Sequence, residues 1–295
     1  MKIRESTVDR VFDITNCLIL VMIAFATLFP FLIVIGTSIT PPEEIMRKTT
    51  GIFRIPQHVT FDYYRYILKG NSPILRALGI TVFRTAAGTT INLILTALTA
   101  YPLSKKYIPG MNGIMKLFFF TMLFSGGMIP NYLVVRSLHL TNTLWALILP
   151  GALSVYNMII MRTFFRSIPE EIEESARMDG CSDIMILFRI ILPLSLPAIA
   201  SLGLFYAVAH WNAFFDAVLY ITDRKIWPMQ LLLREILLTA SVSELDLRNA
   251  LNEATPPPSA LIAATILITT IPIICVYPFL QKYFVKGVLI GSVKG

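Results

Sequence analysis

Charged residues are scarce in this sequence, and so are the motifs that many enzymes use for chemistry. Asp, Glu, Lys and Arg make up 15% of the 295 residues, against about 25% in soluble domains. The three cysteines have no CxxC spacing, and neither an HExxH pattern nor a G-x-x-x-x-G-K-[ST] loop occurs. The sequence therefore indicates no disulfide framework, no metal centre and no phosphate-binding loop for ATP.

Long uncharged runs fill the sequence instead, and the mean hydropathy is +0.69. Six runs of 19 to 29 residues carry no Asp, Glu, Lys or Arg, and a membrane-spanning helix needs roughly 20 apolar residues. The first run contains Ala24-Phe25-Ala26, which imitates a signal-peptide cleavage site, but apolar residues continue to Ile35, so a retained helix is predicted. We predict an all-α membrane protein, one domain over residues 1–295, with six transmembrane helices at about 14–37, 80–102, 114–134, 141–161, 194–219 and 259–280.

The net charge of +7 favours a membrane surface over nucleic acid as partner. Lys and Arg are scattered between the predicted spans and form no stripe, so anionic lipid headgroups are expected to attract them. With six spans both termini lie on one side. If that side is the cytoplasm, 12 basic residues lie inside and 11 outside, so the positive-inside rule barely discriminates between the orientations.

One segment breaks the uncharged pattern, and we call residues 167–193 the charged segment. Five acidic side chains fall within the ten positions Glu170–Asp179. Ser167 and Glu170 have capping-box spacing, so a helix is predicted to begin here. Gly180 is expected to end it in a left-handed conformation, and Ser182 to cap a second helix that ends at Leu192-Pro193.

The first of these helices carries a narrow face of small side chains, formed by Ile172 and Ala176 with Ser175 beside them. Such a face suits a helix that docks in a groove of another protein. An ordinary solvated hairpin between two spans is the alternative interpretation.

The spacing of this segment resembles the EAA loop of bacterial ABC importer permeases: Glu174-Ser175-Ala176, then Gly180, Ile190 and Leu192-Pro193. Ser175 departs from the usual alanine but remains small. The resemblance implies a cytoplasmic coupling loop over residues 164–193 that is seated in a cleft of a separate ATPase subunit. The residues expected to couple to the ATPase are Glu170, Glu171, Glu174, Ser175, Ala176, Asp179, Gly180, Ile190, Leu192 and Pro193.

Further motifs narrow the resemblance to MalG-like sugar permeases. Trp211-Asn212-Ala213-Phe214 is similar to their Trp-Asn-x-Phe signature, and the tail, residues 281–295, ends like theirs in Val293-Lys294-Gly295. In that family the tail reaches between the ATPase subunits. Phe124–Pro130, Asn142–Trp145 and Thr255–Pro258 resemble a subgroup that imports aldouronate or pectin oligosaccharides.

The resemblance implies a non-enzymatic transport subunit without cofactors, in the bacterial plasma membrane, with both termini cytoplasmic. The implied partners are a second homologous permease, a cytoplasmic ATPase dimer, an extracytoplasmic sugar-binding protein, membrane lipid and the oligosaccharide. An ATP-independent channel or secondary carrier is the alternative, although no repeat relates the two halves. An ABC permease for a solute other than a sugar is a further alternative, which only the Trp211 region and the tail disfavour.

The predicted fifth span contains the one acid deep in an apolar run, Asp216. A carboxylate at the bilayer centre costs about 3 kcal/mol, so Asp216 is expected to face a bundle interior or water. Asn212 and Tyr220 lie four residues to either side, and Trp211 offers an aromatic face, so these four residues are candidates for a sugar path. Equally, Asp216 could lie at the solvated outer end. His210 is expected to be packed and hydrogen-bonded.

Overall fold

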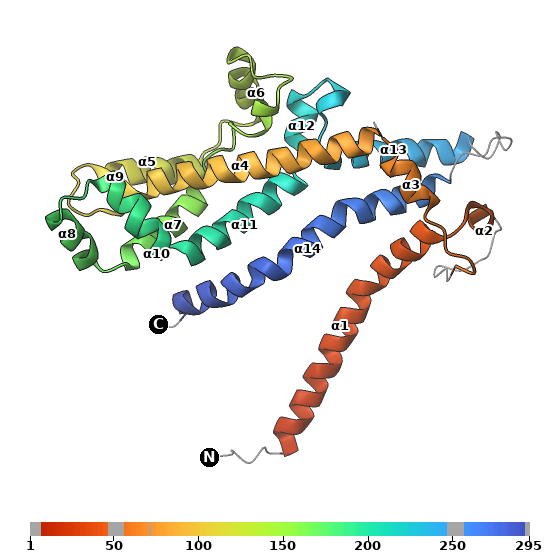
Figure 1. The fold of residues 1–295 in the computed structure, drawn as a ribbon, viewed down its shortest axis with the longest axis horizontal. Coiled ribbons are helices and arrows are strands. Elements are labelled where there is room, and N and C mark those ends of the chain that lie inside the picture. Colours follow the sequence, from red (N-terminus) through yellow and green to blue (C-terminus); the bar gives the residue numbers. More distant parts are fainter. Residues whose placement is uncertain (1–6, 47–55, 71, 247–256, 293–295) are drawn as a thin grey trace. The chain divides into compact units, whose positions relative to one another are not determined.

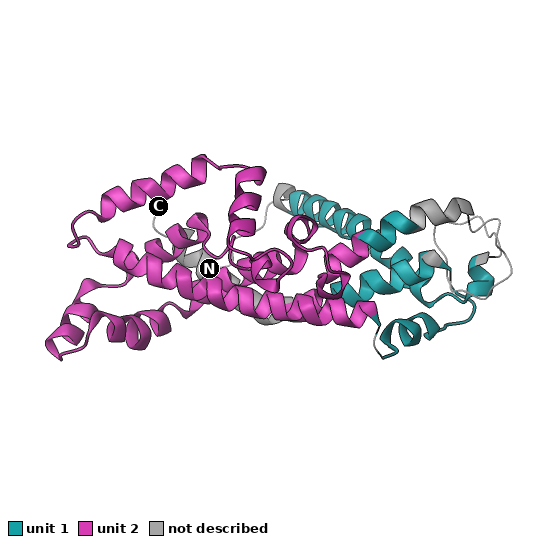
Figure 2. Cartoon of the chain, turned by 90° about the horizontal axis from the view of Figure 1, so that it is seen from above, with its two compact units in different colours: residues 1–72, 235–270 teal, residues 73–234, 271–295 magenta. Residues whose placement is uncertain are grey.

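The computed structural model describes residues 7–46, 56–70, 72–246 and 257–292, and these form helices with no strand among them. The chain divides into two compact units, residues 1–72 with 235–270 and residues 73–234 with 271–295 (Figure 2). An all-α fold is therefore confirmed for the described residues.

The first unit contains one long apolar helix, α1 (Thr7–Ile39), and two short ones, α2 (Pro42–Met46) and α3 (Asp62–Leu68). Hydrogen bonds fasten α3 to the end of α1: the Tyr63 hydroxyl donates to the Thr40 carbonyl over 3.0 Å, and the Tyr64 hydroxyl donates to Ser38 Oγ over 2.8 Å. Residues 10–39 of α1 bury none of their most apolar stretch within the chain. The apolar surface of α1 is therefore open to lipid or to another subunit.

The second unit is built around α4 (Pro73–Ser104), which packs against α7 (Val155–Ser167) and α11 (Leu196–Asn212) (Figure 1). Buried residues recur along α4 every three or four positions, which is the period of one helix face: Ala77, Thr81, Arg84, Gly88, Asn92, Thr96 and Ala100. This face is more polar than that of a soluble helix. Polar side chains can join helices in a membrane, where apolar surface alone does not drive association.

Two predicted spans are broken in the structure. The predicted span 114–134 consists of α5 (Met111–Leu123) and α6 (Met128–Ser137), which meet at an angle of 114°. Gly127 between them has a φ of 86°, a left-handed backbone that glycine adopts without steric cost. The predicted span 194–219 consists of α11 and α12 (Phe215–Tyr220), separated by Ala213 and Phe214.

The predicted span 141–161 is not one helix either. It begins with η1, a 3₁₀ turn over Leu144–Leu147, and α7 begins only at Val155, where the Ser154 hydroxyl accepts a hydrogen bond from the Asn157 amide. Pro150 and Gly151 lie between the two and interrupt helical hydrogen bonding. With 13 residues, α7 is about 20 Å long and shorter than a bilayer core.

Three described helices are long and apolar enough to cross a membrane: Arg10–Ile39, Pro73–Ser104 and Ser259–Val276, the last within α14 (Pro258–Ser292). The number rises to five if each of two bent pairs counts as one span, α5 with α6 and Asp183–Leu194 with Leu196–Asn212. The predicted count of six exceeds this by the η1–α7 region. The remaining elements are α8 (Glu170–Met178), α9 (Asp183–Ile186), the π-helical turn η2 (Leu187–Ile191), α10 (Leu192–Leu194), the 3₁₀ turn η3 (Arg224–Ile226) and α13 (Met229–Asp246).

Two apolar clusters form the core of the second unit. The larger one joins the C-terminal part of α4 to α7, α8, η2 and α11, with the fully buried Ala100, Met158, Met161, Ile191 and Leu202. The smaller one joins α6, η1, α12 and the start of α13, with Ala146 and Ala217 at its centre. Each cluster surrounds one of the two charged sites described next.

Candidate functional site

The charged segment forms a helical hairpin, as predicted, but its first helix begins differently. α8 starts at Glu170 after Pro169, and no side chain caps it. The predicted capping box is wrong, because Ser167 is the last residue of α7 and its hydroxyl donates to the Phe164 carbonyl over 2.7 Å. Gly180 has a φ of 82°, as expected, and Ser182 accepts a hydrogen bond from the Met185 amide at the start of α9. The second helix continues one residue past Pro193 to Leu194.

The two sides of α8 have different surroundings. Its acidic side chains Glu170, Glu171 and Glu174 are exposed, as are Ser175 and Met178. Ala176 is buried in the large apolar cluster of this chain, whereas Ile172 is exposed. Of the predicted docking face, Ile172 and Ser175 are therefore exposed, whereas Ala176 exposes only 7% of its surface.

Five of the predicted coupling residues nevertheless come together. A surface groove of about 470 Å³ beside α8 is lined by Glu171, Ile172, Ser175, Ala176, Asp179 and Ile190. Ile190 reaches this groove from η2 because the turn at Gly180 folds the second helix back along the first. Leu192 packs against the large apolar cluster, and Pro193 is exposed away from the groove's lining.

Glu173, which no sequence pattern singled out, is the one acid of α8 that is buried, with 6% of its surface exposed. Its carboxylate pairs with the Lys105 ammonium, directly after the end of α4, and accepts a 3.4 Å hydrogen bond from the Tyr101 hydroxyl. The Lys105 ammonium also lies 4.4 Å from the centroid of the Tyr101 ring. The sequence does contain an indication that Glu173 is buried, because Glu173 and Ala176 lie three residues apart and so share one helix face.

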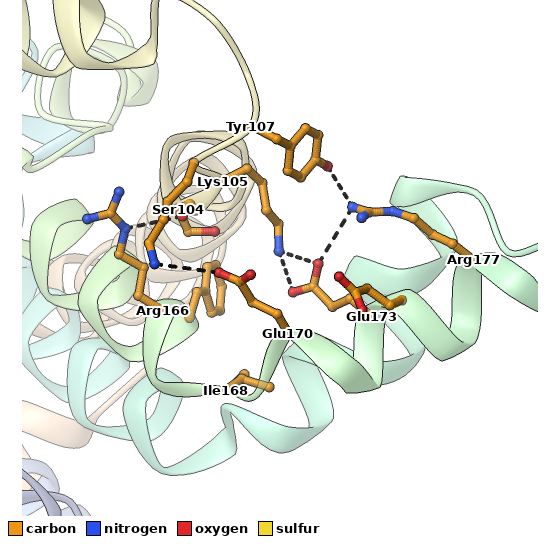
Figure 3. A pocket seen from close by; sticks show the side chains of 11 residues that line it. Ser104, Lys105, Tyr107, Arg166, Ile168, Glu170, Glu173 and Arg177 are labelled. Carbon is orange, nitrogen blue, oxygen red and sulfur yellow. Dashed lines mark hydrogen bonds and ion pairs between the residues drawn. The ribbon is translucent and has the colours of Figure 1, made fainter.

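Arg177 extends the network toward the loop after α4 (Figure 3). Its guanidinium donates to the Tyr107 hydroxyl over 2.6 Å and to Asp183 over 3.1 Å, and it lies 3.7 Å from Glu173. Burial raises the pKa of Tyr107, and the carboxylates of Asp183 and Glu173 add to that rise while Arg177 opposes it. Burial lowers the pKa of Arg177, but its hydrogen bond to Asp183 and the nearby negative charges raise it by more. Tyr107 thus stays neutral and Arg177 stays charged.

A cavity of about 140 Å³ lies between α8 and the ends of α4 and α7. Its charged lining combines both signs and comes from three elements: Lys105, Lys106, Arg166, Glu170, Glu173, Glu174 and Arg177. Among the described residues no group of three or more His, Cys, Asp or Glu side chains could hold a metal ion. The Lys105–Glu173 and Lys106–Glu170 ion pairs in this lining join α8 to the residues that follow α4.

Two arginines of α7 bind the end of α4. Arg162 Nε donates to the Leu103 carbonyl over 2.7 Å, and Arg166 Nε donates to the Ser104 carbonyl over 3.1 Å. The last carbonyls of a helix have no partner within it and carry partial negative charge, so cations bind well there.

A second ion pair lies near the other end of α4. Arg84, only 2% exposed, pairs with Asp216 and donates to the carbonyls of Leu147 over 3.2 Å and Ala213 over 3.1 Å. Asp216 thus has a cation as its partner. Arg84 was not among the predicted site residues, although it is the charge that borders the apolar run of the second predicted span.

Asn212, Asp216 and Tyr220 do not share one helical face, which corrects the expectation from their four-residue spacing. α11 ends at Asn212 and α12 begins at Phe215, so the helix is broken between Asn212 and Asp216. Trp211 is buried, and Tyr220 is buried with its ring 6.2 Å from that of Tyr132 and nearly parallel to it. Asn212 is the exposed member.

His210 is packed and hydrogen-bonded, as expected. Its Nε2 lies 3.3 Å from Asn92 Nδ2 of α4, and Thr96 and Tyr206 join the same two helices through their hydroxyls, 2.7 Å apart. Gly88 makes room for the imidazole, because a Cβ there would lie 2.4 Å from His210 Nε2. The predicted tail contact, Val293-Lys294-Gly295, lies outside the described residues.

Comparison with known proteins decides the family. Residues 4–290 match the model of the binding-protein-dependent transport system inner membrane component family. This chain belongs to that family. The resemblance to ABC sugar importer permeases is thereby confirmed, and the family places the chain among membrane-embedded components of transport systems.

Individual members of the family are similar over almost their whole length. Protein LplC of Bacillus subtilis is 46% identical, over 97% of this chain and 96% of its own. The polygalacturonan/rhamnogalacturonan transport system permease protein YtcP of the same organism is 45% identical, over 97% and 99%. A chain in the crystal structure of a bacterial ABC transporter involved in the import of the acidic polysaccharide alginate is 31% identical, with a TM-score of 0.87 over 96% of this chain and 100% of that one.

Proposed function

We propose that this chain is a permease subunit of an ATP-driven ABC importer and that α8 docks on its cytoplasmic ATPase. The observation that carries this proposal is the division of α8 into two sides. Glu173 and Ala176 anchor the helix to its own chain, while Glu170, Glu171, Glu174 and Ser175 remain exposed together. An exposed acidic helix beside an open groove suits a partner surface with basic residues and a complementary cleft.

Six spans follow if the η1–α7 region crosses the bilayer together with the five spans counted by length. An interrupted span is tolerated where its free backbone groups find partners inside the protein. Here the Leu147 carbonyl accepts from Arg84, and the Ser154 amide donates to the Tyr206 hydroxyl. Docking on an ATPase puts the charged segment, and with it both termini and the tail 281–295, in the cytoplasm.

The proposed cargo is an acidic oligosaccharide, delivered by an extracytoplasmic binding protein. Two similar proteins support this: one is named for the transport of polygalacturonan and rhamnogalacturonan, and the other is a chain of an ABC transporter involved in the import of the acidic polysaccharide alginate. Of the four candidates for the sugar path, Asn212 is the residue we assign to it, since its side chain is exposed. The other three candidates would stabilise the wall of the path without lining it: Trp211, Asp216 and Tyr220.

A second, homologous permease subunit completes the proposed complex. The most apolar stretch of α1, in which no residue is buried within the chain, offers one interface for it, and lipid would cover the remainder.

Docking is tested by purifying the tagged chain from its own host in mild detergent and measuring the ATPase that accompanies it. Glu174→Lys, which reverses the charge of an exposed side chain, should lower the recovered ATP hydrolysis at least about tenfold, since like charges across an interface are strongly unfavourable. Asp62→Lys, an equivalent reversal at an exposed position in the first unit, should leave recovery unchanged. Full recovery with Glu174→Lys, or with residues 170–180 deleted, would contradict the proposal.

The cargo is tested with two trisaccharides of equal length, trigalacturonate and maltotriose, in proteoliposomes that contain the complete importer and its binding protein. ATP-dependent uptake of trigalacturonate alone is expected. Uptake of maltotriose alone would agree with the proposed importer but would contradict the proposal that its cargo is acidic.

A further inference from the structure

Two Lys–Glu pairs join the same two segments, and they differ sharply in burial. Lys106 lies 3.8 Å from Glu170, with 75% and 78% of the two side chains exposed. Lys105 pairs with Glu173, and only 10% and 8% of these side chains are exposed. An exposed pair contributes little because water screens it. A buried pair stays together, because separating it leaves an uncompensated charge in a low-dielectric interior.

The buried pair belongs to a set of contacts that fastens the end of α4. Arg162 and Arg166 bind the last two carbonyls of α4, and the Tyr101 ring meets Phe165 of α7 edge-on, with centroids 6.2 Å apart. Lys105 follows these carbonyls directly and holds Glu173 of α8. The ends of α4 and α7 and the start of α8 therefore form one packed body.

α4 continues from this body without a break for 32 residues, about 48 Å. Along its way it is bound to α11 by the Thr96–Tyr206 and Asn92–His210 hydrogen bonds. Near its other end Arg84 binds the Ala213 carbonyl and Asp216, on either side of the break between α11 and α12. A displacement of α4 along its axis would thus reach that break.

We propose that Lys105 and Glu173 are positioning residues that pass a displacement of α8 on to α4. This inference rests on the proposed docking of α8, because docking supplies the displacement. Glu171 lines the open groove beside α8, whereas Glu173 faces the residues that follow α4 (Figure 3). Binding of the ATPase and transmission of its movement are therefore assigned to different glutamates of one helix.

The test uses the complete importer in proteoliposomes, with whichever of the two trisaccharides the wild type imports. ATP hydrolysis and sugar uptake are measured in the same vesicles for Lys105→Met, Glu173→Gln and the double exchange Lys105→Glu with Glu173→Lys. In Lys105→Met the Glu173 carboxylate keeps Arg177 at 3.7 Å. Lys106→Met, which removes the neighbouring exposed ammonium, is the matched control.

Both single variants should retain the ATPase but import roughly 3- to 30-fold less sugar per ATP hydrolysed, the range expected for a lost coupling interaction. The double exchange should restore most of the ratio, and Lys106→Met should leave it unchanged. Wild-type ratios in both single variants would overturn the inference, and so would a double exchange that assembles with a low ratio. If a single variant does not assemble, the double exchange decides alone. The proposed docking has its own test: it is contradicted if the Glu174→Lys variant still co-purifies with the ATPase.

Discussion

Two ion pairs involve α4, one at Arg84 in its first half and one at Lys105 directly after its last residue, and they join different elements. Arg84 binds Asp216 and two backbone carbonyls, so one guanidinium fixes η1 and the break between α11 and α12. Lys105 binds the carboxylate of a helix whose opposite side is exposed. An ion pair therefore closes a break inside the chain at Arg84 and anchors a helix with an exposed side at Lys105.

The difference follows from the chemistry of the two cations. A guanidinium has five donors in a fixed plane and can satisfy several acceptors at once, whereas an ammonium is a compact point charge on a flexible stem. Arg84 suits a rigid junction with three acceptors. Lys105 suits a contact that persists while the helix it holds changes its position.

Loss of the Arg84 pair should have the largest effect on stability. Arg84→Met leaves Asp216 without its cation and two carbonyls without a donor, which should cost about 3–5 kcal/mol of unfolding free energy. Denaturant unfolding in mixed micelles measures it. Arg136→Met, at an exposed arginine of α6, should change little. A loss of unfolding free energy below about 1 kcal/mol in Arg84→Met would contradict the role of Arg84 as a rigid junction.

The packing of α4 on α11 can be tested with two glycines of α4. Gly88→Ala places a Cβ 2.4 Å from His210 Nε2, and overpacking of this kind costs about 1–3 kcal/mol. Gly79→Ala meets nothing within 4 Å and should stabilise the helix by about 0.5–1 kcal/mol. Opposite signs in the unfolding free energies are the expected outcome. Equal shifts would contradict close packing of α4 on α11.

The turn at Gly180 concerns α8 alone and not the Arg84 junction. Gly180 is left-handed and has open space around it, so Gly180→Ala should cost about 1–2 kcal/mol through backbone strain alone. Gly180→Asn should cost less, because asparagine tolerates this conformation. The same unfolding measurement applies. If alanine and asparagine behave alike, the turn is not strained.

The exposed lysine beside Lys105 should have the smallest effect. Lys106→Met removes a pair in which both side chains are about three-quarters exposed, so unfolding free energy should change by less than about 1 kcal/mol. Lys105→Met should lose more in the same assay. An equal effect of both variants would show that burial does not separate the two pairs.

Local patterns in the sequence predicted much of this chain. Uncharged runs located α1, α4 and α14, and Gly180 and Ser182 behave as their residue types indicate. The predictions failed where local signals competed. Ser167 had the spacing of a cap but is the last residue of α7. Three predicted helices are interrupted, at Gly127, at Pro150-Gly151 and at Ala213-Phe214. The alternation of charged and apolar segments in the sequence does not show whether a predicted helix is continuous.

Composition and short-range spacing alone determined that this is a helical membrane protein with one acidic, exposed hairpin, because both follow from transfer energies and local backbone preferences. Only the tertiary structure decided which charges are buried. Asp216 has its cation 132 positions away, and Glu173 has its own 68 positions away. Whether a carboxylate is exposed or paired depends on which distant residue the packing of helices brings beside it, and four glutamates in one short helix look alike until that packing is known.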